Sequence, residues 1–314
     1  MKFILRRECD FERILLRESG AMLRSLTMNL IDTVAILGTG LLGASLARAL
    51  KARGVAKNVK AWSRSESTRE KCRALPNIFD EVCESPSCAA ANADLIVLCT
   101  PTDKIPVVAA EISGNLKGGA ILTDVGSVKT AICSQCEKIC AGTGAVFVGS
   151  HPMAGSEKIG IDFSDDRLFE NRPCFVVSNS QDEPAAKILA EFWTAVGMKV
   201  YCTSPRNHDF IVAHISHLPH LLAGTLCVNA SKSPDDLKKY CGPGFRDTTR
   251  VASGSPEIWE SIISDNRSEI LPALKDYRAD LDALISNIEN CDSAAVSAHL
   301  RAAKKYRDEL QNTL

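Results

Sequence analysis

The sequence predicts two domains, an α/β domain built on a parallel sheet and an all-α domain after it. From residue 31 to about 204, strand-like apolar runs alternate with helical stretches, whereas from about Pro205 onward Ala, Leu and Ile recur at helical spacing without a convincing strand. A chain of 314 residues also exceeds the usual size of a single hydrophobic core. We therefore expect domains over 31–204 and 205–314, after an N-terminal extension, 1–30, whose role the sequence does not indicate.

The first strand is expected over 33–38, where an apolar run enters the turn Gly38-Thr39-Gly40-Leu41-Leu42-Gly43 and an Ala- and Leu-rich stretch leaves it. A G-x-G-x-x-G turn between a strand and a helix is typical of a Rossmann dinucleotide-binding domain. Gly38 permits the tight turn, Gly40 lets the backbone approach a pyrophosphate, and Gly43 lets helix and strand pack closely. The helix N-terminus supplies N–H groups and partial positive charge for the phosphates.

The second strand, over 59–62, ends at Ser63-Arg64-Ser65. An NAD site usually places Asp or Glu here to accept from the ribose 2′-hydroxyl, whereas serine followed by arginine offers donors and positive charge. NADP is therefore the preferred cofactor. The alternative is that Arg64 is a solvated loop residue and that NAD is used as well.

Further strands are expected over 94–99, 119–123, 145–149 and 173–178. Ligands of parallel sheets bind beyond the carboxyl ends of the strands. This places the loops at Thr100 and Pro101, Asp124 to Ser127, and Ser150 to Gly155 along one edge with the first two loops.

Helical patterns occupy 207–230, 234–240, 244–253, 256–288 and 292–313. A single small layer of such helices does not easily bury every apolar face. We therefore expect this all-α domain to mediate homodimerisation, with a compact monomer as the alternative.

Composition favours a soluble enzyme with a small-molecule partner. The formal net charge of −1 gives no electrostatic reason to bind nucleic acid, and no membrane span is indicated. Within the extension, Glu8, Glu12 and Glu18 argue against a transit peptide, and no long apolar stretch suggests a signal peptide. A cytoplasmic location is expected.

The sequence gives two reasons to consider a metal, and neither is sufficient. Cys133, Cys136 and Cys140 include a C-x-x-C, but their spacing is also that of one helix face, and no second Cys/His pair completes a zinc site. Four of the six histidines lie between His208 and His220, beside Pro219, without the carboxylate or cysteine of a typical shell. We expect reduced core thiols, imidazoles presented to a cleft, and no metal.

Five segments in collinear order resemble the prephenate/arogenate dehydrogenase family: Gly38-Thr39-Gly40-Leu41-Leu42-Gly43, Asp124-Val125-Gly126-Ser127-Val128-Lys129, His151-Pro152-Met153-Ala154-Gly155-Ser156-Glu157, Ser216-His217-Leu218-Pro219-His220 and Gly244-Phe245-Arg246-Asp247-Thr248-Thr249-Arg250. The loop from His151 and the segment ending at Arg250 are the most specific of these. The resemblance as a whole covers roughly 31–290. The resemblance implies oxidative decarboxylation of a cyclohexadienyl substrate in tyrosine biosynthesis, by a Rossmann domain with a helical dimerisation domain.

The resemblance also implies roles for individual residues. His151 resembles the catalytic histidine, and an imidazole with a pKa near about 6.5 suits acceptance of the substrate's 4-hydroxyl proton. Ser127 would orient that hydroxyl or the imidazole. Arg250 matches the position that binds a substrate carboxylate, and His217 and His220 would line the pocket.

Each assignment has a structural alternative. Ser127 is also well suited to cap the following helix, and Arg250 to pair with Asp247 three residues earlier. Glu157 fits a salt bridge that closes the cleft, and Trp259 fits either the substrate pocket or a helix core. We treat Glu157, Asp247 and Trp259 as supporting residues.

Within the family, prephenate is favoured over arogenate, because a histidine at 220 donates to a keto acid and, when protonated, repels an ammonium group. Arogenate and dual cyclohexadienyl specificity remain open, as does tyrosine inhibition at the active site. Two other classes stay open. An NADP-dependent hydroxyacid or imine oxidoreductase would more typically use a catalytic lysine, and a non-enzymatic NADP sensor would need neither His151 nor Arg250.

Overall fold

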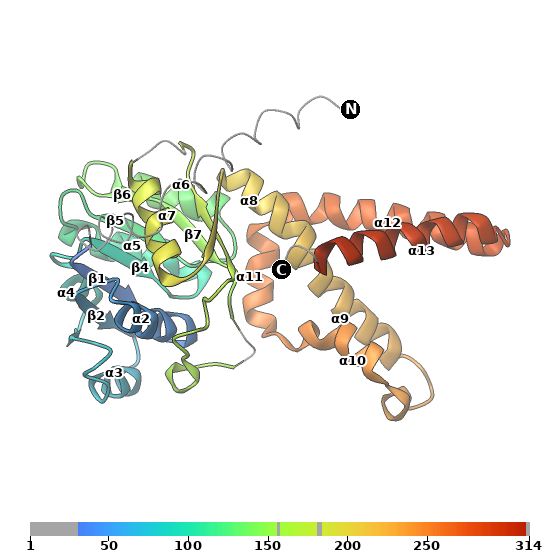
Figure 1. Cartoon of the computed structure of the whole chain (residues 1–314), viewed down its shortest axis with the longest axis horizontal. Helices are drawn as coiled ribbons and strands as arrows, with labels where there is room; N and C mark the ends of the chain where they lie inside the picture. The colour runs from blue at the N-terminus through green and yellow to red at the C-terminus, as the bar shows by residue number, and fades with distance from the viewer. Residues whose placement is uncertain (1–30, 156–157, 181–183, 312–314) are drawn as a thin grey trace. The chain divides into compact units, whose positions relative to one another are not determined.

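The computed structural model describes residues 31–155, 158–180 and 184–311 (Figure 1). The extension 1–30 lies outside them. The chain forms two compact units, which divide between His208 and Asp209.

The first unit is built on a six-stranded parallel sheet in the order β3-β2-β1-β4-β5-β6. Its strands are β1 (Thr33–Leu37), β2 (Asn58–Trp62), β3 (Glu81–Val82), β4 (Leu95–Leu98), β5 (Ile121–Asp124) and β6 (Val146–Phe147). Every residue of β4 is buried, as expected for a central strand of a parallel sheet that has helices on both faces. This is the doubly wound α/β architecture that the alternating pattern predicts.

Helices and short 3₁₀ turns connect the strands. The helices are α2 (Leu41–Arg53), α3 (Glu66–Arg73), α4 (Pro86–Ala90), α5 (Ile105–Ile112), α6 (Thr130–Cys140) and α7 (Pro184–Val196), and the turns are η1 (Thr102–Lys104), η2 (Ser113–Asn115) and η3 (Ile161–Phe163). Cys133, Cys136 and Cys140 are all buried on one face of α6, as their spacing predicts.

A second sheet of three strands differs from the expected single parallel sheet. It contains β7 (Gly149–Pro152), β8 (Pro173–Val177) and β9 (Lys199–Thr203), with β7 antiparallel and β9 parallel to β8. The strand expected over 145–149 is therefore two strands that meet at Val148, and the one expected over 173–178 belongs to this sheet. The predictions also missed β3 and β9. β3 has only two residues, and three of the five residues of β9 are exposed.

The second unit is helical. After α8 (Pro205–Val212), the π-helical turn η4 (Ala213–His217) leads into α9 (Leu218–Ser231), followed by η5 (Leu237–Tyr240), α10 (Pro243–Thr249), η6 (Arg250–Ser253), α11 (Pro256–Asp265), α12 (Arg267–Glu289) and α13 (Ser293–Gln311). The helix expected over 256–288 is broken at Asn266, and only a 3₁₀ turn forms within 234–240. Helices α12 and α13 run side by side as a long hairpin (Figure 1).

The helical run Pro205–Ser231 is long and apolar enough to cross a membrane on length and composition alone. Core helices of soluble proteins meet the same two criteria, so one such run is weak evidence for a membrane span. On α12, Tyr277, Leu281, Ile285 and Ile288 are exposed at spacings that place them along one helical face. The second unit therefore carries apolar surface on more than one helix.

Candidate active site

The glycine turn after β1 forms a cradle whose three glycines have different constraints. Gly38 has a φ of +106°, and a Cβ there would lie 2.6 Å from the carbonyl oxygen of Cys99. A Cβ on Gly43 would collide with the carbonyl oxygen of Gly38, so the helix packs directly on the turn. A Cβ on Gly40 would meet nothing within 4 Å, so the open side of the turn lies there. This is the arrangement in which a backbone accepts a pyrophosphate.

Two further features fit a dinucleotide at this edge. Gly40 is the N-cap of α2 and no side chain caps that helix, so its first N–H groups suit a phosphate. The Thr100 hydroxyl, after β4, is buried without a hydrogen-bond partner among the described residues. A buried hydroxyl is costly to leave unpaired, and a bound ligand would supply the partner. Thr39, in contrast, is fully buried and its hydroxyl accepts from the Cys72 thiol at 3.2 Å.

The loop after β2 is held by Arg69. Its guanidinium donates to the carbonyl oxygens of Ser63, at 2.7 Å, and Arg64, at 3.2 Å, and also pairs with Glu66. The Arg64 side chain is exposed, and the Ser65 hydroxyl lies 2.7 Å from that of Ser67. The guanidinium of Arg69 is thus engaged by other groups of the protein, whereas the Arg64 side chain is exposed to solvent.

Asp124 and Lys129, which flank Ser127 in the sequence, form a fully buried ion pair. Asp124 also accepts from the backbone N–H of Gly126 at 2.8 Å and, more weakly, from that of Ser150 at 3.3 Å. The Ser150 hydroxyl donates to the Asp124 carbonyl oxygen at 2.5 Å. These bonds tie the loop that carries Ser127 to the strand that carries His151. The N-cap of α6 is Lys129, so the structure does not support the alternative in which Ser127 caps that helix.

His151 lies on β7, largely buried, with Nδ1 2.9 Å from Nε2 of His208. His208 is fully buried at the start of α8, and Phe175 packs edge-on against its ring at 5.2 Å. A short imidazole pair of this kind fixes the ring of His151, because each tautomer of one ring requires the complementary tautomer of the other. Sequence analysis counted His208 in the histidine cluster but did not assign it to the site.

In the second unit, His217 is buried and its Nδ1 lies 3.1 Å from the Asn266 amide nitrogen. That nitrogen also donates to the carbonyl oxygen of Asp209 at 2.8 Å. An amide N–H pointing at Nδ1 makes Nδ1 the acceptor and places the proton of the neutral ring on Nε2. Asn266, which interrupts the expected long helix, was not predicted to matter, because the sequence pattern indicated one continuous helix there.

His220 stacks on Trp259, with ring centroids 3.4 Å apart and planes at 11°. A Cβ on Gly254 would come within 2.7 Å of the indole nitrogen and 3.1 Å of the imidazole. Burial lowers the pKa of His220 below its ordinary value. The lowered pKa favours the uncharged ring at neutral pH. An uncharged His220 does not repel the ammonium group of arogenate, so the preference for prephenate rests on hydrogen bonding to its keto group.

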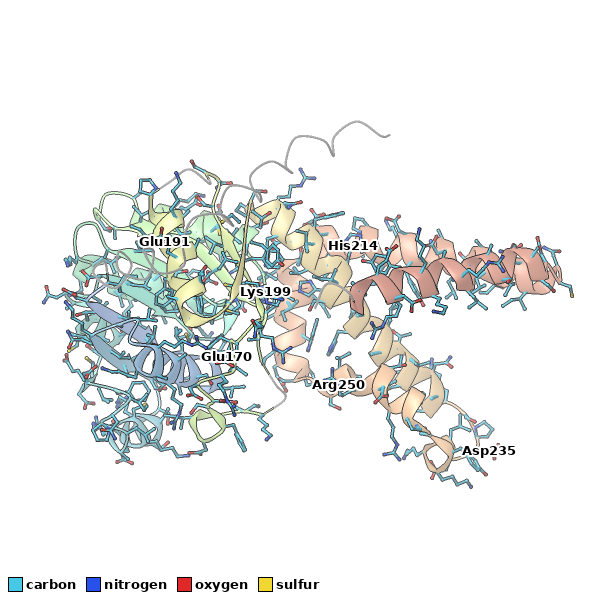
Figure 2. All side chains as sticks on the ribbon, viewed as in Figure 1. Glu170, Glu191, Lys199, His214, Asp235 and Arg250 are labelled. Carbon is cyan, nitrogen blue, oxygen red and sulfur yellow. The ribbon has the colours of Figure 1, made fainter. Side chains whose placement is uncertain are left out.

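Arg250 begins η6 and is exposed, and no ion pair joins it to Asp247 in the part of the chain that the structure describes (Figure 2). The guanidinium is thus available to an anionic ligand. His214 does not join the other histidines, because its Nδ1 lies 2.8 Å from the Phe210 carbonyl oxygen and its ring packs on Phe210. Glu157 lies outside the described residues.

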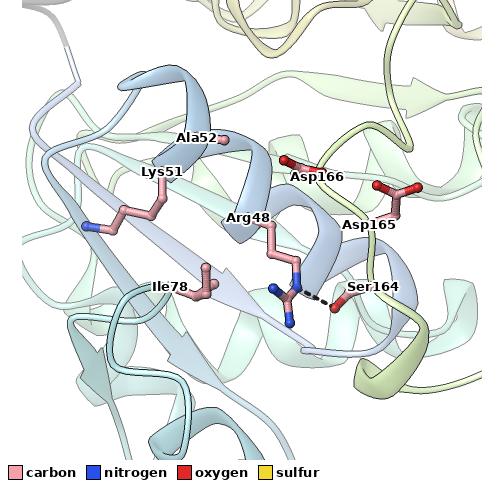
Figure 3. Close-up of a pocket in the computed structure, with 7 residues that line it drawn as sticks. All are labelled: Arg48, Lys51, Ala52, Ile78, Ser164, Asp165 and Asp166. Carbon is pink, nitrogen blue, oxygen red and sulfur yellow. Dashed lines mark hydrogen bonds between the residues drawn. The ribbon is translucent and has the colours of Figure 1, made fainter.

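The first unit also contains a pocket of about 460 Å³ along the C-terminal half of α2, lined by Arg48, Lys51, Asp165 and Asp166 among others (Figure 3). Arg48 Nε donates to the Ser164 hydroxyl at 2.7 Å across it. The glycine turn is at the opposite end of α2, so this pocket is separate from the dinucleotide cradle.

Comparison with known proteins places both units in one family. Residues 46–202 match the family model described as prephenate dehydrogenase, nucleotide-binding domain, and residues 204–302 match prephenate dehydrogenase, dimerization domain. A cyclohexadienyl dehydrogenase of Zymomonas mobilis is 34% identical over 286 residues, which cover 89% of this chain and 96% of that protein. The chain belongs to the prephenate/arogenate dehydrogenase family.

Solved structures of the family agree in fold. Synechocystis arogenate dehydrogenase superposes with a TM-score of 0.78 at 33% identity, covering 88% of this chain and 99% of that one. The A. aeolicus prephenate dehydrogenase in complex with hydroxyphenyl propionate and NAD+ gives 0.82 at 30% identity, covering 89% and 98%. This family member is therefore an NAD(P)-dependent oxidoreductase with a Rossmann domain and a helical domain.

Proposed function

We propose that the protein oxidatively decarboxylates prephenate to 4-hydroxyphenylpyruvate with NADP as hydride acceptor, in the synthesis of tyrosine. The observation that carries the proposal is the buried His151–His208 pair, which shares the first unit with a dinucleotide cradle and is tied to the Ser127 loop. Loss of hydride from C4 and of carbon dioxide from C1 leaves an aromatic phenol, so aromatisation drives the reaction. The protein needs only to orient the ring, accept the hydroxyl proton and bind the carboxylates.

His151 is assigned the proton transfer. Its Nδ1 is engaged with His208, so the 4-hydroxyl proton goes to Nε2 as the hydride leaves C4, and it returns to the same oxygen when loss of carbon dioxide from C1 forms the phenolate. When the ring becomes an imidazolium, Nδ1–H donates to Nε2 of His208, which spreads the new charge over a short hydrogen bond. The hydroxyl of Ser127 orients the substrate hydroxyl toward Nε2. When bound, the nicotinamide would supply the hydride acceptor.

Arg250 is assigned to a substrate carboxylate, which its planar fork of donors suits. His217 and His220 are assigned to the ring and side-chain pocket, with Trp259 supporting His220 by stacking. Arogenate is the alternative substrate, since the relatives include dehydrogenases named for arogenate and for cyclohexadienyl substrates. Tyrosine, the eventual product, is proposed to inhibit at the same pocket. Asp247 and Glu157 keep their proposed supporting roles.

NADP is proposed as the preferred cofactor, with NAD accepted more weakly. The support is the absence of a carboxylate at Ser63 together with the exposed guanidinium of Arg64. A 2′-phosphate would pair with Arg64, while Arg69 holds the loop that presents it.

A cytoplasmic homodimer is proposed. The dimerization-domain match and the exposed apolar face of α12 support pairing through the second unit. This pairing also explains why the apolar run over α8, η4 and α9 does not require a membrane.

The test is steady-state turnover with prephenate and with arogenate, each with NADP and with NAD. Changing His151→Asn should leave NADP affinity unchanged and lower kcat by about 100-fold or more, the usual scale of a general base. His299→Asn, on the exposed face of α13, is the matched control and should turn over normally. An unchanged kcat in His151→Asn would show that His151 is not the general base. Turnover with arogenate but not with prephenate would show that arogenate is the substrate.

A further inference from the structure

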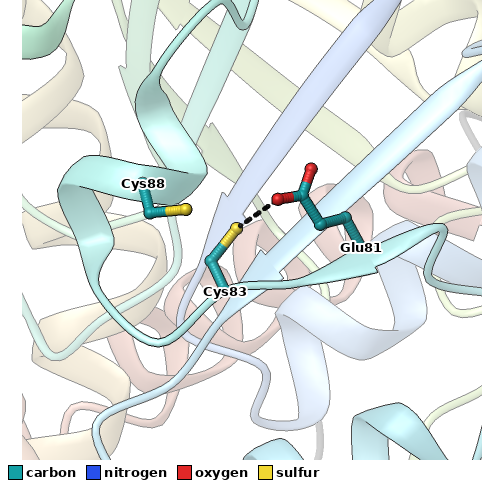
Figure 4. Close-up of side chains that lie close together, drawn as sticks. All are labelled: Glu81, Cys83 and Cys88. Carbon is teal, nitrogen blue, oxygen red and sulfur yellow. Dashed lines mark hydrogen bonds between the residues drawn. The ribbon is translucent and has the colours of Figure 1, made fainter.

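Three side chains that the proposed reaction does not use converge at the edge of the six-stranded sheet (Figure 4). Glu81 lies on the edge strand β3, Cys83 follows it directly, and Cys88 lies on α4. One oxygen of the carboxylate and the two Sγ atoms all lie within 4.8 Å of one another. Cys83 is buried, whereas Glu81 and Cys88 are exposed, so the group can be reached from solvent.

Two polar contacts hold this group. The Cys83 thiol donates to Glu81 Oε1 at 3.4 Å, an ordinary length for a hydrogen bond from sulfur. Lys60 Nζ binds the other oxygen, Oε2, at 3.1 Å, and this bond is the main reason that the pKa of Glu81 is lowered. The carboxylate is therefore ionised at neutral pH, with one oxygen turned toward the thiols.

The pKa of the Cys83 thiol, in contrast, is raised above its ordinary value. Burial and the neighbouring Cys88 and Glu81 raise the pKa of Cys83. Three groups that would repel one another as anions thus lie together, and the cation paired with them among the described residues is Lys60, on the other oxygen of the carboxylate. A divalent cation in the middle would satisfy all three at once.

We propose that Glu81, Cys83 and Cys88 form a binding site for a thiophilic divalent cation of the Zn²⁺ type. Zinc is bound by thiolates at about 2.3 Å and carboxylates at about 2.0–2.2 Å in tetrahedral sites, which puts donor atoms nearly 4 Å apart. The convergence within 4.8 Å needs only small side-chain adjustments to reach that geometry. Water completes the fourth position. On binding, each thiol releases one proton, so the ion with its two thiolates and one carboxylate carries a net charge of −1 that Lys60 offsets.

The bound ion would join the edge strand to α4. Strand β3 has only two residues, and α4 only five, so neither has many backbone bonds of its own. The sequence analysis expected no metal in this protein and reduced core thiols throughout, so the proposal departs from that expectation. The spacing of this E-x-C-x₄-C segment differs from that of common structural zinc sites.

The test is titration of the full-length, chelator-stripped, reduced protein with Co²⁺ and with Zn²⁺. Wild type should show a thiolate-to-cobalt absorption band, bind one more ion than Cys88→Ser, and gain thermal stability on Zn²⁺ addition. Cys88→Ser should lose the band and the gain, and Glu81→Gln should weaken affinity at least about tenfold, because a charged ligand is lost. Both substitutions are at exposed side chains, so the fold should tolerate them.

Cys202→Ser, at another exposed cysteine of the same unit, is the matched control and should behave as wild type. Equal ion counts in wild type and Cys88→Ser, or an equal gain in thermal stability, would overturn the proposal. So would a wild-type protein without the absorption band. None of these measurements depends on enzymatic turnover.

Discussion

The substitution Lys129→Met removes a buried cation and should be among the single changes that most destabilise the first unit. Both partners of the Lys129–Asp124 pair are completely buried, so the substitution leaves an unpaired carboxylate in the protein interior. Breaking such a pair typically costs about 3–5 kcal/mol. Asp124 keeps the backbone donors of Gly126 and Ser150, so we expect a value near the lower end, about 3 kcal/mol.

The assay is urea unfolding under reducing conditions, with Lys117→Met as a matched control. Lys117 forms an ion pair with Asp94 that is partly exposed, and loss of such a solvent-screened pair should cost far less than loss of the buried pair. The double change Lys129→Met with Asp124→Asn should recover much of the loss, because no uncompensated charge remains. A loss in Lys129→Met no larger than in the control would refute this reasoning.

Three further outcomes are expected. Gly40→Ala should leave the free energy of unfolding within about 0.5 kcal/mol, since its Cβ meets nothing and its φ of −73° is ordinary, yet raise the NADP dissociation constant at least about tenfold. Gly43→Ala should instead cost about 1–3 kcal/mol in urea unfolding, and equal losses in both variants would contradict these separate roles. The pKa of His220 is lowered in the folded state. As pH falls below about 6.5, the unfolded chain therefore binds a proton at this residue more readily than the folded chain does, which favours unfolding. Thermal stability should therefore fall more steeply with decreasing pH in wild type than in His220→Phe, which keeps the stacking, and parallel Tm profiles would count against this. Ser63→Asp should shift the kcat/KM ratio toward NAD, and a ratio that does not move would reject the 2′-phosphate argument.

Local sequence patterns predicted the parts of the fold whose causes are local. The apolar run at β1, the glycine turn and the helix after it are consecutive, so their order alone indicates a dinucleotide cradle. Strand β9 escaped prediction because it lies at the edge of a small sheet, with Tyr201 and Cys202 exposed, and lacks a continuous apolar signal. Local patterns also could not predict that 145–152 divides into β6 and β7. The division arises because β6 pairs with β5 whereas β7 pairs with β8 of the second sheet.

The candidate site shows the same limit. Sequence motifs singled out His151 and Ser127, but the partner of His151 is 57 positions away, and only the fold brings His208 to it. Lys129 was quoted within a motif without a role, since sequence does not reveal that its ammonium group is completely buried. The alternative roles of Ser127 and Arg250 could be compared only in the structure, where Lys129 is the N-cap of α6 and no ion pair joins Arg250 to Asp247 among the described residues.

The π-helical turn between α8 and α9 makes the chain sensitive to its exact length at this point. The N–H of Leu218 donates to the carbonyl oxygen of Ala213, five residues back, and Pro219 follows with no N–H to restore the regular pattern. Deleting one residue here would turn every later position of α9 by about 100° and shift it by about 1.5 Å along the axis. His220 would then leave the face of Trp259 although no residue in contact with either ring had changed. Length variants in this turn would therefore separate the contribution of rotational register from that of side-chain chemistry.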